Sequence, residues 1–351
     1  MRGHRPAPVL GTFVLGAAGG WAGWAAGLPL GVLLGSMLTV AVVSVAGLRL
    51  WGAMPGVPAH WRFALVPVIG VAIGASVPAD FLTQAVRWWP SVLAVLAFVP
   101  LAHWASYRIY RRLGRVDPAT ALFAAMPGGF IEALEMGEER GAEMQMLIML
   151  QFLRLILCIV LVPLSFALVT GHAVGSGSGM VMPGADVPLR AFDVGVLTAA
   201  AVIGYWGASR LNFPAAVLSG PLFVSGLAHA VGLTAATPPD WAITVTQWVV
   251  GTTLGTRFAG LDLRRLWLAM RLSVVAIAVS LALAAGIALT LAGPVGEPAT
   301  AVMLAFAPGG ISEMALVAIS LQMSAVYVTL HHLLRIVLAV LVARAGLRLI
   351  G

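Results

Sequence analysis

Long apolar runs, separated by short polar segments, make up most of this chain. Ten runs are long enough to cross about 30 Å of hydrocarbon as helices. Two further apolar segments, 119–136 and 299–319, are interrupted near their middles by Pro-Gly-Gly. The pattern predicts an all-α integral membrane protein with about ten transmembrane helices. The uninterrupted runs lie at 9–26, 29–48, 62–78, 88–109, 145–169, 191–209, 213–232, 241–257, 268–292 and 323–343.

The composition supports a chain that is solvated mainly by lipid. Apolar residues make up 60% and charged residues 9% of the 351 residues, and the mean hydropathy is +1.00, which excludes an ordinary soluble domain. The 20 basic residues are all arginines, and the net charge is +7. No segment outside the apolar runs is long enough to fold as a basic module, so we do not expect nucleic acid as a partner. The single cysteine, Cys158, excludes an intramolecular disulfide.

The chain contains two copies of one pattern. Most matching positions are related by one constant offset in the numbering, and those nearest the start by a slightly longer offset. We therefore predict a first membrane repeat at 1–170, a Gly- and Ser-rich linker at 171–190 and a second repeat at 191–351. The matches include Pro127-Gly128-Gly129 with Pro308-Gly309-Gly310, Glu132 with Glu313, and Arg154 with Arg335 at the first offset, and Pro29 and Gly35 with Pro214 and Gly220 at the longer one.

The arginines indicate how the two repeats are oriented. If both interrupted segments cross the membrane, the arginines outside the spans divide 11 to 7 between the two sides. If each segment enters and returns on one side, the division is 16 to 2, with only Arg87 and Arg190 outside. Cytoplasmic loops concentrate positive charge. We therefore predict inverted repeats with two re-entrant or broken helices, and both termini in the cytoplasm of a bacterial inner membrane.

The two Pro-Gly-Gly breaks are the strongest candidates for a binding site. A break leaves backbone groups unpaired, and these are tolerated in a membrane only against protein or a water-filled cavity. Corresponding breaks in two repeats are typical of transporter sites, where half-helix N-termini face an anion. The alternative is a kink that serves packing. We predict that Pro127, Gly128, Gly129, Pro308, Gly309 and Gly310 contribute to substrate binding.

Two glutamates and two arginines follow the breaks. Glu132 and Glu313 lie five residues after each proline, where a carboxylate must face the interior. They could bind a proton or a cation such as sodium and couple it to transport, or they could form structural ion pairs. Arg154 and Arg335, in the apolar run that follows each glutamate, would either neutralise the glutamates or bind an anionic substrate.

The repeats differ at two polar positions near the breaks. Ser312 and His332 stand where the first repeat has Ile131 and Gln151, which predicts an asymmetric site that includes Ser312 and His332. Neighbouring histidines point about 100° apart on a helix, so His331 and His332 cannot chelate one metal as an i, i+4 pair would. We expect no metal site and no cofactor.

Small residues at helical spacing predict close helix packing in both repeats. Gly70 and Gly74, and their copies Gly251 and Gly255, have the four-residue spacing that lets membrane helices approach closely.

The second motif, Ala307 to Glu313 followed by His331 to Arg335, resembles the membrane AbrB duplication family of bacteria, and the resemblance covers nearly the whole chain. The first copy departs from it at Phe130-Ile131 and Gln151-Phe152. Members carry the names AbrB family transcriptional regulator or ammonia monooxygenase. A DNA-binding regulator needs a soluble basic module, and an oxygenase needs a metal site. We recognise neither a soluble basic module nor a metal site in this sequence.

The sequence therefore predicts a secondary transporter of a small anionic or polar metabolite, coupled to a proton or a cation. There is no phosphate-binding P-loop to power it, and we do not expect an enzyme. The alternatives are a membrane sensor or regulator that affects gene expression indirectly and, less favoured, a channel or an ammonia-oxidising membrane enzyme. The expected partners are the lipid bilayer and a small-molecule substrate, and association into a homo-oligomer stays open.

Overall fold

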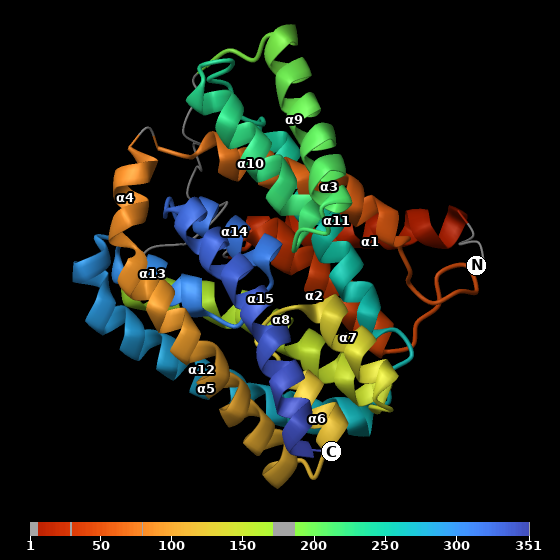
Figure 1. The fold of residues 1–351 in the computed structure, drawn as a ribbon. Coiled ribbons are helices and arrows are strands. Elements are labelled where there is room, and N and C mark those ends of the chain that lie inside the picture. Colours follow the sequence, from red (N-terminus) through yellow and green to blue (C-terminus); the bar gives the residue numbers. More distant parts are fainter. Residues whose placement is uncertain (1–5, 29, 79, 171–186, 351) are drawn as a thin grey trace. The chain divides into compact units, whose positions relative to one another are not determined.

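The computed structural model describes residues 6–28, 30–78, 80–170 and 187–350, and every extended regular element in them is a helix (Figure 1). This confirms the all-α membrane class. Most of the predicted linker, 171–186, lies outside the described residues. The longer helices are α1 (Pro6–Ala25), α2 (Gly31–Val45), α3 (Ala59–Ala75), α5 (Trp89–Leu113), α8 (Met144–Thr170), α9 (Ala191–Arg210), α10 (Ala216–Ala230), α11 (Asp240–Gly255), α12 (Leu263–Val295) and α15 (Ala325–Ile350).

Each of the ten predicted apolar runs overlaps one of these helices. Five of them, α5, α8, α9, α12 and α15, are long and apolar enough to cross a membrane, while α2, α3 and α10 are shorter apolar helices. The number of spans stays a prediction. Each interrupted segment forms two short helices, and a short helix before α5 was not expected. These elements are α4 (Phe81–Arg87), α6 (Pro118–Ala124), α7 (Phe130–Glu139), α13 (Ala299–Phe306) and α14 (Ile311–Ser320), besides a 3-10 turn at Thr256–Phe258.

The helix bounds recur along the chain at the two offsets found in the sequence. The starts of α1 and α2 match those of α9 and α10 at the longer offset. The starts of α3, α7 and α8 match those of α11, α14 and α15 at the shorter one. The chain forms two compact units, and each draws segments from both predicted repeats. The first unit contains 1–79, 163–261 and 315–326, and the second contains 80–162, 262–314 and 327–351.

In the first unit, glycines bring helices of different repeats into backbone contact. A Cβ added at Gly70 or Gly74 of α3 would lie 2.4 or 2.5 Å from a carbonyl oxygen of α10. A Cβ added at Gly251 or Gly255 of α11 would lie 2.4 or 2.6 Å from a carbonyl oxygen of α2. These contacts confirm that the spaced glycines serve helix packing.

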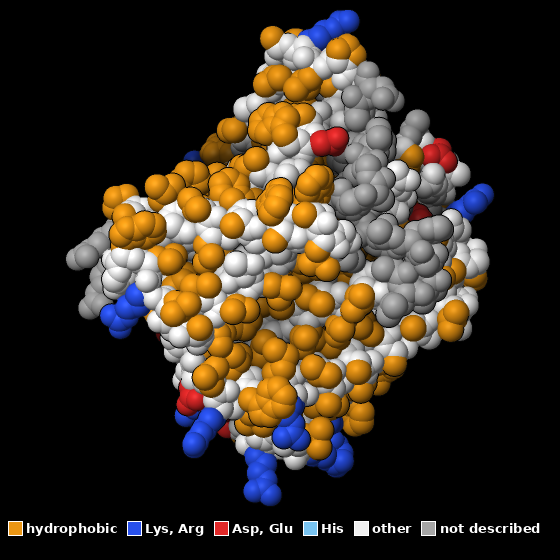
Figure 2. Space-filling view, turned by 180° about the vertical axis from the view of Figure 1, so that it is seen from behind, with side chains coloured by type: hydrophobic (Ala, Val, Ile, Leu, Met, Phe, Trp, Pro, Cys, Tyr) orange, Lys and Arg blue, Asp and Glu red, His pale blue; other side chains and the backbone are white. Residues whose placement is uncertain are grey.

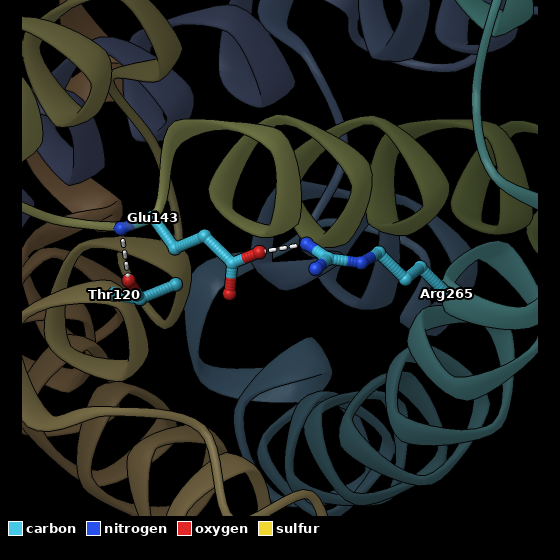
Figure 3. Close-up of polar contacts among 3 residues, drawn as sticks. All are labelled: Thr120, Glu143 and Arg265. Atoms are coloured by element: carbon cyan, nitrogen blue, oxygen red, sulfur yellow. Dashed lines mark hydrogen bonds and ion pairs between the residues drawn. The ribbon is translucent and has the colours of Figure 1, made fainter.

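In the second unit, the α6–α7 hairpin enters and leaves at one end. The backbone N–H of Glu143, just after α7, donates to Oγ1 of Thr120 at the start of α6, over 2.7 Å (Figure 3). The Glu143 carboxylate also pairs with Arg265 in the first turn of α12. The two ends of this hairpin are therefore joined, as expected for a re-entrant segment.

The α13–α14 segment begins at the opposite end of the second unit, and the chain returns there. Gly296, just before α13, lies beside the guanidinium of Arg87 at the end of α4. Tyr327, in the first turn of α15, stacks edge-on against Trp88, with 5.1 Å between ring centroids. These contacts lie at the N-terminal end of α5, whose 25 residues span about 37 Å. The two hairpins thus enter the second unit from opposite ends.

Helices α5 and α15 finish at one end of the second unit, close to α6 (Figure 1). The last turns of both helices contain arginines. Arg140 and Arg344 line one pocket there, and Arg265 lies at the ion pair with Glu143. Figure 2 shows blue side chains gathered at its lower end, below a face that is covered mainly by hydrophobic side chains. We call this the arginine-rich end. Arg87 lies at the other end of α5.

Cysteine labelling can test this arrangement directly. In a Cys158→Ala background, we expect Arg115→Cys and Glu139→Cys to react with a membrane-impermeant maleimide from the same side of the membrane. Both side chains are exposed and flank the first hairpin. Arg87→Cys, at the opposite end of α5, should react only from the other side. Labelling of Glu139→Cys and Arg87→Cys from one side would contradict the re-entrant hairpin.

Candidate binding site

The two breaks lie in the second unit, and each separates two short helices. Helix α6 ends at Ala124 and α7 begins at Phe130, while α13 ends at Phe306 and α14 begins at Ile311. Gly129 has φ of 71°, a left-handed conformation that glycine adopts without steric cost. At Gly310, an added Cβ would lie 2.2 Å from the carboxylate of Glu313. Both glycines therefore allow the chain to turn tightly into the second helix of each hairpin.

The two glutamates occupy the third residue of α7 and of α14. Their carboxylates fold back towards the start of their own helices, because Oε2 of Glu132 lies 3.2 Å from an ideal Cβ at Gly129, and Glu313 is similarly placed at Gly310. Ser312 donates a hydrogen bond to Glu313 over 2.9 Å. Glu313 is buried and Glu132 is half-buried. A carboxylate at this position stabilises the positive end of a helix dipole.

The two arginines hold the chain at the breaks. Arg154 donates to the carbonyl oxygen of Met126, and Arg335 donates to those of Ala307 and, over 2.7 Å, Gly309. Met126 and Ala307 occupy matching positions of the two repeats, directly before each proline, so the two contacts correspond. Each guanidinium thereby satisfies carbonyl groups that the broken helices leave unpaired.

Both arginine side chains are buried, with exposed fractions of 5% for Arg154 and 2% for Arg335. Among the described residues, neither guanidinium pairs with a carboxylate, so the alternative of ion pairs with Glu132 and Glu313 is not what this structure has. The Nε of each arginine is buried and has no hydrogen-bond partner in the described part of the chain. Two charged donors are therefore left for a ligand to satisfy.

The breaks and the arginines surround a small cavity of about 40 Å³. Each break also packs on a helix of the other repeat: Gly128 lies against Ile336 of α15, and Gly310 lies near Leu155 of α8. A volume of this size has room for roughly three water molecules. The cavity is lined by Gly128, Gly129, Arg154, Leu155, Gly309, Gly310, Ile311, His332, Arg335 and Ile336.

The structure brings most of the predicted site residues together around this cavity. Five predicted site residues lie in or beside the breaks but outside the cavity lining, namely Pro127, Glu132, Pro308, Ser312 and Glu313. The sequence did not identify Gln151, whose amide nitrogen donates to the carbonyl of Phe123 over 2.7 Å. The signal that could have identified it is its position, because Gln151 lies one helical turn before Arg154, as His332 lies one helical turn before Arg335. Within the described residues, no group of three or more His, Cys, Asp or Glu side chains could hold a metal ion.

Comparison with known proteins places the chain in a family. Residues 33–351 match a family model described as transition state regulatory protein AbrB. The protein YhjN of Bacillus subtilis (strain 168) is 25% identical over 347 residues, which cover 93% of this chain and 88% of that protein. A protein described as a regulator, AbrB of Escherichia coli (strain K12), is 24% identical over 297 residues, covering 83% of this chain and 81% of that protein. Because the family match spans most of its length, the chain belongs to the AbrB family.

Proposed function

We propose that this protein is a secondary transporter of a small anion, which binds in the cavity between the two Pro-Gly-Gly breaks. The observation that carries the proposal is the pair of buried arginines, Arg154 and Arg335, which line the cavity and whose Nε groups have no hydrogen-bond partner among the described residues. Buried guanidinium donors without a carboxylate partner are costly unless a ligand accepts from them. A carboxylate or another oxyanion matches the fork of donors on a guanidinium.

The placement of the hairpins supports transport by alternating access. One hairpin has both ends at the arginine-rich end of the second unit, and the other is anchored at the opposite end. Broken helices that meet near the midplane from opposite sides are the arrangement that inverted-repeat transporters use. In our proposal the membrane is a bacterial inner membrane, and the arginine-rich end faces the cytoplasm because positive loops are retained there.

We further propose that Glu132 and Glu313 couple the anion to a proton or to sodium. Each carboxylate lies at the start of a half-helix beside one break, so a change in its charge or ligation would alter the electrostatic field at the cavity.

Uptake into proteoliposomes tests both parts of the proposal. We expect saturable uptake of an anion driven by a proton or sodium gradient, and loss of gradient dependence in the double variant Glu132→Gln, Glu313→Gln. Glu135→Gln is the matched control, because Glu135 is an exposed residue of α7 one turn beyond Glu132. Gradient-driven uptake that survives the double substitution would disprove the coupling role. Absence of any flux from the wild-type protein would count against the transporter.

Regulation of gene expression is the second candidate, because the family model is described as a transition state regulatory protein and the Escherichia coli relative as a regulator. In this chain such an effect would pass through the anion that the cavity binds, either as a sensed signal or as a transported one. Ligand binding without flux, together with a co-purifying partner, would favour the sensor over the transporter.

A further inference from the structure

Beside the two arginines, each repeat presents a hydrogen-bond acceptor. The Nδ1 of His332 lies 2.9 Å from the carbonyl oxygen of Val328. A carbonyl can only accept, so Nδ1 carries the hydrogen, and Nε2 of the neutral ring is left with a lone pair. This Nε2 is buried without a partner in the described part of the chain, and His332 lines the cavity with an exposed fraction of 1%.

Gln151 repeats this arrangement in the first repeat. Its amide nitrogen is held by the Phe123 carbonyl, so its Oε1 is the free end of the group. That oxygen is buried and has no partner among the described residues. Gln151 precedes Arg154 by three residues, as His332 precedes Arg335, so each acceptor lies one helical turn from a buried guanidinium. In both halves of the chain, an unsatisfied acceptor thus lies three residues before a buried arginine, and of the two acceptor residues His332 lines the cavity.

The neighbouring residue in the same helix, His331, is a histidine whose two ring nitrogens both have hydrogen-bond partners. His331 is 2.8 Å from the Tyr327 carbonyl through Nδ1 and 2.8 Å from Oγ of Ser91 through Nε2. Both of its nitrogens have partners inside the protein. His332 differs because its second nitrogen has no partner among the described residues, although the residue lines the cavity.

We propose that the transported anion carries a hydroxyl group, and that His332 Nε2 accepts a hydrogen bond from it while the arginines hold its charged oxygens. This inference rests on the proposed anion site and names the substrate class. A small oxyanion with a hydroxyl, such as a 2-hydroxycarboxylate or hydrogencarbonate, satisfies both the Nε donors and the orphaned acceptor. An anion without a hydroxyl leaves the acceptor buried and unpaired, which costs affinity.

Two pairs of matched anions test the inference by ligand-induced thermal stabilisation of the full-length protein in detergent. Glycolate and acetate differ by one hydroxyl group, and hydrogencarbonate and nitrate are planar anions of equal charge and similar size, of which only the first carries a hydroxyl. We expect at least one hydroxyl-bearing anion to bind about tenfold or more tightly than its partner, because an unpaired buried acceptor is expensive. A preference in the first pair identifies a hydroxycarboxylate site, and one in the second pair identifies a hydrogencarbonate site.

Variants then assign the preference to His332. The change His332→Leu should abolish the preference, because leucine offers no acceptor to the hydroxyl group of the anion. The change His332→Gln, which installs the residue of the first repeat, should retain it. The control His331→Leu should also retain it, because His331 faces Ser91. Any loss of folding in a variant would appear as a lower melting temperature without anion.

Equal binding within both pairs by the wild-type protein would overturn the inference, as would a preference that survives His332→Leu. If one of these results is obtained but Arg335→Gln abolishes the binding of acetate or nitrate, the proposed anion site stands and only the assignment of the hydroxyl contact fails. If none of the four anions stabilises the wild-type protein, the anion site fails as well.

Discussion

Replacing Arg335 with glutamine is expected to weaken anion binding by about 30-fold or more, because removing one partner of a buried charged contact costs at least about 2 kcal/mol. Arg335 is 2% exposed and lines the cavity, and its Nε has no hydrogen-bond partner in the part of the chain that the structure describes. Glutamine is shorter and neutral, so it supplies neither the charge nor the fork of donors. The affinity is measured by thermal stabilisation, and uptake into proteoliposomes should fall in parallel.

Three companion variants separate binding from folding. Arg335→Lys keeps the charge but loses the second donor to the break, so it should bind anions more weakly than wild type and more tightly than Arg335→Gln. Arg154→Gln removes the corresponding group of the first repeat and should have a similar effect. Arg344→Gln is the matched control, since Arg344 lies in the same helix but is exposed at the arginine-rich end. Unchanged anion affinity in both Arg154→Gln and Arg335→Gln would refute the proposed site.

The substitution Gly204→Val is expected to destabilise the first unit by about 3 kcal/mol or more, which exceeds the usual cost of overpacking because the obstructing atoms are backbone. An added Cβ at Gly204 would lie 2.5 Å from the carbonyl carbon and oxygen of Gly220, and one at Gly220 would lie 2.0 Å from the carbonyl oxygen of Gly204. Helices α9 and α10 therefore cannot keep their separation with a side chain at this position.

Gly207→Val is the control for this prediction. It lies in the same helix, three residues further on, and an added Cβ there meets nothing within 4 Å. Both variants replace a glycine of α9 with valine, so their change in helix propensity is the same. The melting temperature in detergent should fall strongly for Gly204→Val and little for Gly207→Val. Equal falls would contradict the packing argument.

The sequence predicted the helices well because lipid imposes a simple rule. A backbone in hydrocarbon must satisfy its own hydrogen bonds, so each long apolar run had to be helical, and each Pro-Gly-Gly had to break a helix. Helix α4 was missed because its seven residues, which include Gln84 and Arg87, are too few and too polar to stand out. The paired glutamates and arginines were recognised through the repeat.

The contacts inside the site could not be predicted in the same way. The sequence suggested that Arg154 and Arg335 could neutralise Glu132 and Glu313, because opposite charges in a membrane attract strongly. In the structure each glutamate stays at the start of its own half-helix, and each arginine reaches carbonyls of the break. Which acceptor an arginine reaches depends on the path of the returning chain, and spacing along the sequence does not contain that path.

In the first unit, glycines of α3 and α11 contact helices that are distant in the sequence, and these contacts bear on the order in which the protein can be assembled. Helix α3 packs through Gly70 and Gly74 on α10, which is synthesised much later, and α11 returns to cover α2. Chains fold from the N-terminus during synthesis. Helices α2 and α3 must therefore be inserted before their partners are synthesised, and until then the surfaces that later form the glycine contacts face lipid. Biogenesis of this unit can be completed only after α11 has been inserted.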